Sequence, residues 1–168
     1  FDSYGRPLVS TQQRDVLYTH MVGYDAWGRA LSESHQRGSD TAKVFERRYN
    51  AYGYQFQVLR GLTTPSTGYQ VLWQANTMNA RMQLKAAALG NGLNVARDYY
   101  DASGHLQSTK LLQGSVSKLE EAYTYEKLGN VLTRMQSWAS DANNGAAVIF
   151  NESFTYDNLN RLETAMVS

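Results

Sequence analysis

The sequence contains no cysteine and only two prolines among its 168 residues. Without cysteine, the chain has no disulfide framework, no thiolate metal site and no cysteine nucleophile. It also lacks any apolar run close to the roughly 20 residues that a membrane-spanning helix needs. Its 16 Lys and Arg nearly balance 15 Asp and Glu, which leaves a formal net charge of +1. This balance argues against a dedicated nucleic-acid-binding protein, which normally carries a clustered basic excess.

Aromatic residues are plentiful, with 12 Tyr, 5 Phe and 3 Trp, and this content excludes a disordered chain. They recur in a short motif: an aromatic residue, Asp or Asn, two variable positions, Gly, and then often Arg. Successive copies start 22 (78 to 100) to 31 (125 to 156) residues apart, which indicates a repeat architecture. The seven copies begin at Phe1, Tyr24, Tyr49, Met78, Tyr100, Tyr125 and Tyr156.

The motif has the chemistry of a short hairpin turn, a type I turn followed by one residue in the left-handed region. The Asp or Asn side chain can accept a backbone N–H two residues on, so it holds the turn from inside. Gly supplies the positive φ, and Asn160 can replace it in the last copy. The copy at Met78 is degenerate. Met82 stands at its glycine position, so we expect that turn to be altered.

Between the motifs, apolar and polar residues alternate with period two, which predicts strands with two different faces. Variable turn signals lie midway, at 13–15, 37–40, 63–68, 90–92, 114–117 and 140–145. Each repeat is therefore two strands, and the chain is predicted to be all-β, an antiparallel meander of repeated β-hairpins with about thirteen strands. Propensity alone favours a helix over Thr77 to Leu89, but the repeat register predicts a strand there.

The recurring Tyr-Asp-x-x-Gly-Arg unit resembles the YD, or Rhs, repeat, and the resemblance covers residues 1–168 as a single YD-repeat region. The family includes bacterial Rhs polymorphic toxins, the B and C subunits of insecticidal Tc toxins, and teneurins. It implies a β-sheet ribbon that spirals into a hollow shell, which in bacterial members encloses a C-terminal toxin domain. The family's self-cleaving aspartates lie in a region with no counterpart here, so no catalytic residue is transferred.

Other candidate chemistry is weak in this sequence. His20, His35 and His105 are scattered, and we expect them to lie on the surface or on strand faces rather than to bind a metal. Ser115 to Lys118 has the spacing of a serine–lysine pair but falls in a predicted turn. Gly90 to Gly92 is expected to be a hairpin turn rather than a phosphate loop. The remaining candidates are acidic residues in two sets. Glu120 and Glu121 are adjacent and predicted to point to opposite faces, and Asp25, Asp101 and Asp157 are turn residues.

The resemblance to YD repeats implies a fragment of a larger secreted bacterial toxin, a structural section of a shell that encloses and helps to deliver a toxin or effector domain. The expected partners are the rest of the shell, the enclosed domain, and other toxin-complex or secretion-system subunits. We expect no enzyme activity, no cofactor, no metal site, no nucleic acid and no membrane span. The alternative is a β-repeat module that binds carbohydrate or a cell-surface partner through its aromatic residues.

Overall fold

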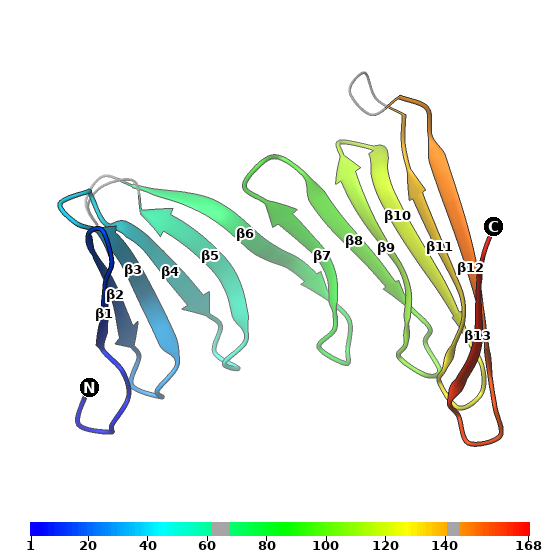
Figure 1. Cartoon of the computed structure of the whole chain (residues 1–168), viewed down its shortest axis with the longest axis horizontal. Helices are drawn as coiled ribbons and strands as arrows, with labels where there is room; N and C mark the ends of the chain where they lie inside the picture. Colours follow the sequence, from blue (N-terminus) through cyan, green and yellow to red (C-terminus); the bar gives the residue numbers. More distant parts are fainter. Residues whose placement is uncertain (62–67, 141–144) are drawn as a thin grey trace. The chain divides into compact units, whose positions relative to one another are not determined.

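The chain folds into β-strands joined by short turns (Figure 1). The computed structural model describes residues 1–61, 68–140 and 145–168, and all regular secondary structure in these ranges is β-strand. The first strands are β1 (Val9–Gln13), β2 (Leu17–Tyr24), β3 (Ala30–Arg37), β4 (Lys43–Tyr49), β5 (Gln55–Gly61) and β6 (Tyr69–Met78). The others are β7 (Leu84–Leu89), β8 (Asn94–Tyr99), β9 (Leu106–Gln113), β10 (Val116–Tyr125), β11 (Val131–Trp138), β12 (Val148–Tyr156) and β13 (Leu162–Val167).

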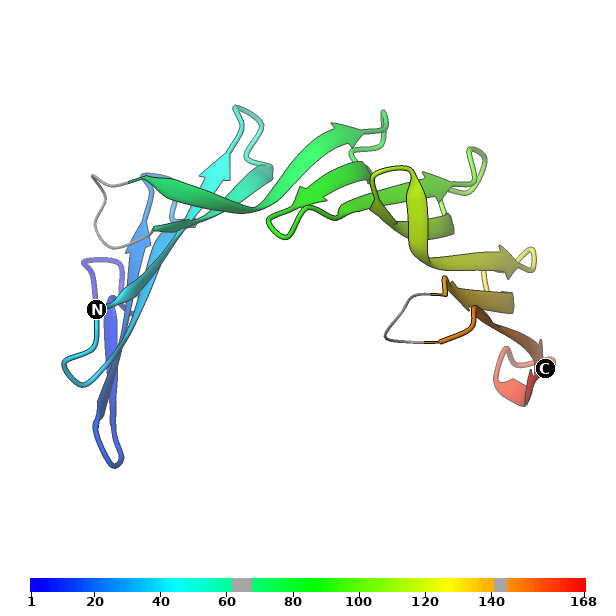
Figure 2. The same ribbon diagram turned by 90° about the horizontal axis from the view of Figure 1, so that it is seen from above.

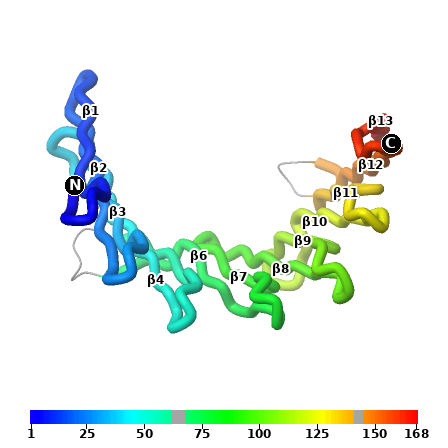
Figure 3. The backbone as a smooth tube through the Cα atoms, turned by 90° about the horizontal axis from the view of Figure 1, so that it is seen from below, coloured from blue at the N-terminus to red at the C-terminus, as the bar shows by residue number. Residues whose placement is uncertain are grey.

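The strand order follows the chain from β1 to β13, and every described pairing is antiparallel. This confirms the predicted all-β meander and its strand number. The chain divides into two compact units, Phe1–Gln74 and Ala75–Ser168, with the boundary inside β6. Within each unit, hairpin follows hairpin along the chain, as Figures 2 and 3 show from two sides.

In each unit the motif turns lie at one end of the strands, the lower end in Figure 1, and the variable turns lie at the other. The described variable turns occupy the predicted places, for example Gly114-Ser115 between β9 and β10. The predicted turns over 63–68 and 140–145 fall mostly on residues 62–67 and 141–144, outside the described residues. The ambiguous segment from Thr77 to Leu89 forms the end of β6, a turn and β7, so the repeat register overrides helix propensity.

Burial is shallow throughout the described residues. Within the ranges that the structure describes, only Leu59 and Ala87 are buried hydrophobic residues, at 2% and 1% exposure. The outermost strands β1 and β13 are exposed at every position and pair on one side only, with β2 and β12. The two units are therefore sheets without a second covering layer among the described residues. No helix in the described ranges is long and apolar enough to span a membrane.

Candidate functional site

The motif turns are the feature on which the recurring residues converge. In the second copy, Asp25 Oδ1 accepts the backbone N–H groups of Trp27 and Arg29 at 2.9 and 3.0 Å. Gly28 N donates to the Asp25 carbonyl at 3.0 Å, which closes the predicted type I turn. The same pair of side-chain caps recurs at Asp2, Asn50, Asn79 and Asp157.

The predicted positive φ is present at the motif glycines, with values of 77, 82, 81, 76 and 94° at Gly5, Gly28, Gly53, Gly104 and Gly129. Asn160 takes 59°, as expected. The prediction of an altered turn at Met82 is wrong. Met82 adopts φ of 61°, and Asn79 forms both caps and both turn hydrogen bonds. The Asn79 caps and the strands on both sides of the turn therefore hold Met82 in the left-handed conformation, which costs about 1–2 kcal/mol.

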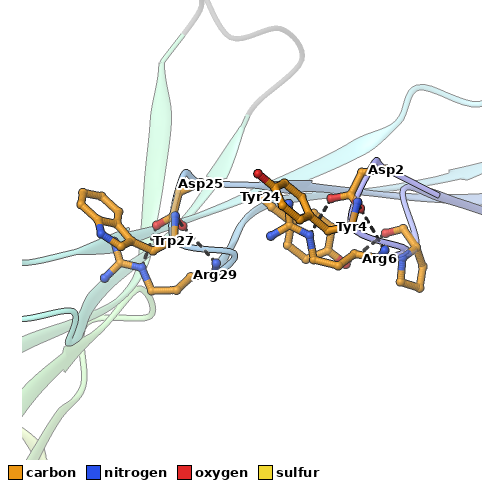
Figure 4. A network of polar contacts seen from close by, with 8 residues as sticks. Asp2, Tyr4, Arg6, Tyr24, Asp25, Trp27 and Arg29 are labelled. Carbon is orange, nitrogen blue, oxygen red and sulfur yellow. Dashed lines mark hydrogen bonds and ion pairs between the residues drawn. The ribbon is translucent and has the colours of Figure 1, made fainter.

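The arginine that follows the glycine is fixed by the same carboxylate that caps the turn (Figure 4). Arg29 Nε lies 2.7 Å from Asp25 Oδ2, and Arg6 pairs with Asp2 in the same way at 2.5 Å. The backbone N–H of Arg161, together with its side chain, lowers the pKa of Asp157 below the ordinary value of 3.8. One carboxylate thus organises the loop and orients a guanidinium group.

The first two oriented arginines reach the next repeat. The guanidinium carbon of Arg6 lies 4.4 Å from the ring centroid of Tyr24, and that of Arg29 lies 4.3 Å from the ring centroid of Tyr49. A Cβ placed on Gly28 would lie 2.7 Å from Arg6 Nη1. The motif glycine therefore has two reasons to lack a side chain, its positive φ and the close approach of the preceding repeat's arginine.

The motif tyrosines connect consecutive repeats in the direction opposite to that of the arginines, from each repeat back to the preceding one. Each hydroxyl donates to the backbone carbonyl of the first residue after the preceding motif's turn, with O···O distances of 2.8 to 3.0 Å. The strand register shifts beside each of these tyrosines, as a β-bulge does. The donor–acceptor pairs are Tyr24–Pro7, Tyr49–Ala30, Tyr99–Leu84, Tyr125–Leu106 and Tyr156–Val131.

In the fifth copy, the motif starts one residue earlier than predicted. Tyr99, not Tyr100, occupies the tyrosine position, because Tyr99 donates to Leu84 while Tyr100 N pairs with the His105 carbonyl across a longer loop. Asp101 was expected to cap this turn. Among the described residues its carboxylate accepts no hydrogen bond, because the extra loop residue moves it out of the capping position.

The other sequence candidates lie in ordinary structural places. Ser115 lies in a turn and Lys118 in β10, and Gly90 to Gly92 form the β7–β8 hairpin. Glu120 and Glu121 are consecutive strand residues, as predicted. Glu120 pairs with Lys110 at 3.0 Å, and Glu121 accepts hydrogen bonds from Tyr123 and Gln136.

The histidines are less scattered than the sequence indicates. His20 and His35 are directly opposite each other on β2 and β3, with stacked rings. His105 takes the place of the motif arginine, and its ring centroid lies 4.7 Å from that of Tyr125. The sequence analysis did not find the His20–His35 pairing, because it depends on the strand register beyond the second motif turn, which includes a shift between Gly23 and Tyr24.

No family model matches the chain, and no curated protein matches it in sequence. Solved structures match it in fold. The crystal structure of TcdB2-TccC3-Cdc42 superposes on 90% of this chain with a TM-score of 0.70 and 20% identity. The fold is that of the YD repeats. The crystal structure of TcdB2-TccC3 and the Photorhabdus luminescens Tc holotoxin pore match 92% and 90% of the chain, both at 16% identity, with TM-scores of 0.62 and 0.60.

The match confirms the resemblance to YD repeats at the level of fold. The chain spans only 7 to 10% of the length of those toxin chains. Sequence reasoning explained the Asp or Asn and the Gly of the YD motif but missed the inter-repeat roles of Tyr and Arg. The signal for the arginine contact was the recurrence of Arg directly after Gly, because a turn alone does not require an arginine there.

Proposed function

We propose that this chain is a section of the wall of a YD-repeat shell, in a secreted bacterial toxin that encloses a C-terminal toxin or effector domain. The fold is that of regions in Tc toxin structures, one of which is a holotoxin pore. The recurring side chains serve to join one repeat to the next. The partners on this proposal are further repeats of the same shell, the enclosed domain and other toxin subunits.

The observation that carries the proposal is the last motif arginine. Arg161 makes the same ion pair with Asp157 as the earlier arginines, with an N···O distance of 2.7 Å. Its side chain is 72% exposed, whereas those of Arg6 and Arg29 are 29% and 28% exposed beneath the next repeat's tyrosine. Arg161 is thus oriented for a tyrosine of a following repeat.

The exposed strands β1 and β13 support the same proposal. A sheet edge presents unpaired N–H and C=O groups, which proteins normally cover or pair. In the proposed shell, β1 and β13 pair with neighbouring YD repeats. One face of the sheet then lines a cavity and the other meets solvent.

The absence of cysteine in the chain allows a direct test in the full natural protein, made cysteine-free elsewhere. Leu132 and Thr133 are consecutive, exposed residues of β11, so their side chains point to opposite faces. We expect a bulky maleimide to label only one of the variants Leu132→Cys and Thr133→Cys in the intact protein. In the isolated chain, both should react. Equal, fast labelling of both in the intact protein would contradict an enclosing wall.

We further propose that this section has no catalytic activity of its own. The side chains that recur in the motif are used in turns and inter-repeat contacts, and the charges are balanced and dispersed. A hydrolytic activity that copurifies with the chain and disappears on substitution of a single Ser, Asp, Glu or His would contradict this proposal.

A second candidate function, binding of carbohydrate or a cell-surface partner, is favoured by a different set of aromatic residues. The motif tyrosines are engaged between repeats, but three successive turn tips carry Tyr4, Trp27 and Tyr52, which are 82%, 80% and 89% exposed. Exposed aromatic rings can stack on sugars. A glycan-array signal that is lost in Trp27→Ala, but kept in the turn-tip control Leu128→Ala, would establish this function. No signal in the unaltered chain would exclude it for the glycans tested.

A further inference from the structure

Two histidines and a glutamate come together on one face of the first unit. His20 of β2 is directly paired with His35 of β3, and their ring centroids are 4.6 Å apart with an interplanar angle of 18°. Glu33 lies two residues before His35, so it projects from the same face of the strand. One potential ligand atom from each of the three side chains lies within 4.8 Å of the others.

The cluster contains a polar atom that the protein leaves unsatisfied. His20 Nε2 is buried and has no hydrogen-bond partner among the described residues. Buried polar atoms in native structures nearly always have a partner, and leaving one unpaired costs about 1–3 kcal/mol. A cation at the edges of the two rings, in line with the nitrogen lone pairs that lie in each ring plane, would provide that partner, because a neutral imidazole nitrogen is a metal ligand.

Glu33 supplies the negative charge. Its Oε2 lies 2.9 Å from Arg47 Nη2, which leaves Oε1 outside this contact. This ion pair with Arg47 holds the Glu33 carboxylate in place. Arg47 thereby acts as the outer partner that orients a ligating carboxylate, an arrangement common around protein metal ions. Lys43, the β4 residue opposite His35, is exposed, so its ammonium group can remain in solvent.

We propose that His20, His35 and Glu33 bind one divalent transition-metal ion, such as zinc, that joins β2 to β3. Two imidazoles and a carboxylate suit zinc and its first-row neighbours better than calcium or magnesium. Tetrahedral zinc places its ligand atoms about 3.3 Å apart, since Zn–N and Zn–O bonds are about 2.0–2.2 Å. The three ligand atoms lie within 4.8 Å of one another. The histidine χ2 torsion is broad, so the two rings can turn out of their stacked arrangement and direct their nitrogen lone pairs at one ion.

The ion serves as a cross-link in the sheet. Three protein ligands leave the fourth tetrahedral position to water. Since the ligands converge only when β2 and β3 are paired, the ion binds the folded state and stabilises it. This inference concerns residues of one hairpin and does not depend on the proposed shell function.

Zinc titration of the full chain by calorimetry at pH 7.5, in a buffer that does not chelate metals, tests the site. We expect one zinc ion per chain and at least tenfold weaker binding in both His20→Gln and His35→Gln. His105→Gln is the matched control and should bind as the unaltered chain does. Cobalt titration should give the visible absorption of a tetrahedral ion in the unaltered chain and in this control.

Zinc should also raise the thermal unfolding midpoint of the unaltered chain and of His105→Gln, but not of the two site variants. His35 is exposed, so His35→Gln keeps the test valid if His20→Gln fails to fold. Three results would overturn the proposal: no saturable binding by the unaltered chain, unchanged affinity in His35→Gln, or equal weakening in His105→Gln.

Discussion

A motif glycine and a glycine of a variable turn together offer the sharpest test of how one repeat is fitted to the next. Gly92 and Gly129 lie in the same unit, in turns closed by the same pattern of backbone hydrogen bonds, with φ of 84 and 94°. A Cβ on Gly92 would meet nothing within 4 Å, but one on Gly129 would lie 3.0 Å from His105 Cε1. The two positions therefore share the cost of positive φ and differ in the contact with the preceding repeat.

Gly92→Val should lower the free energy of unfolding by about 1–2 kcal/mol, the cost of the left-handed conformation for a residue with a Cβ. Gly129→Val should cost about 2–3 kcal/mol, because it also displaces His105 from Tyr125, an aromatic contact of about 0.5–1.5 kcal/mol. Lys127→Val, at a free position of the same turn, should change stability by less than about 0.5 kcal/mol.

Urea denaturation followed by circular dichroism measures these differences at a concentration where the chain is monomeric. In a His105→Ala background, the cost of Gly129→Val should fall to that of Gly92→Val, because the contact is already lost. Equal costs at Gly92 and Gly129 in the unaltered background would refute the reasoning. So would a cost of Gly129→Val that is unchanged in His105→Ala.

Further predictions concern the inter-repeat contacts, acid stability and the sheet edges. Tyr49→Phe should lower the free energy of unfolding by about 1 kcal/mol through loss of its hydrogen bond to Ala30, while Tyr52→Phe, at an exposed turn tip, should leave the urea midpoint unchanged. The pKa of Asp25 is lowered because hydrogen bonds from Arg29 outweigh partial burial, so its contribution to stability is complete above pH 3.8 and is lost as the pH falls through the lower folded-state pKa. Asp25→Asn should therefore lose less stability between pH 5 and pH 3 than the unaltered chain does, as unfolding curves at each pH would show. The isolated chain should associate as its concentration rises, and Val9→Lys with Ala165→Lys, on β1 and β13, should reduce that association in sedimentation experiments.

Much of the fold was predictable because local turn chemistry and period-two alternation both point to hairpins. Asn160 at the glycine position illustrates this, since its tolerance of positive φ was predicted and φ is 59°. Met82 shows the limit. A poor turn residue adopts the turn because Asn79 caps it and the strands on both sides fix its ends. Tyr99 shows a second limit, since the adjacent Tyr99 and Tyr100 left the start of the fifth motif copy ambiguous by one residue.

The contacts between repeats were harder to predict, because they join residues about 20 positions apart whose neighbourhood depends on strand register. Arg29 is an example. Its place after Gly28 is visible in the sequence, but its position over Tyr49 follows only from the hairpin geometry. The His20–His35 pair has the same origin, since an insertion of one residue in the turn between β2 and β3 would separate the two rings.

Cryo-electron microscopy of the full natural protein that contains this sequence tests the central claim most directly. We expect β1 and β13 each to form hydrogen bonds with a further antiparallel strand. We also expect an aromatic residue of the next repeat to cover the Arg161 guanidinium, and the sheet to close around an internal volume. A map in which the sheet ends at β1 and β13, with Arg161 open to solvent, would contradict the shell.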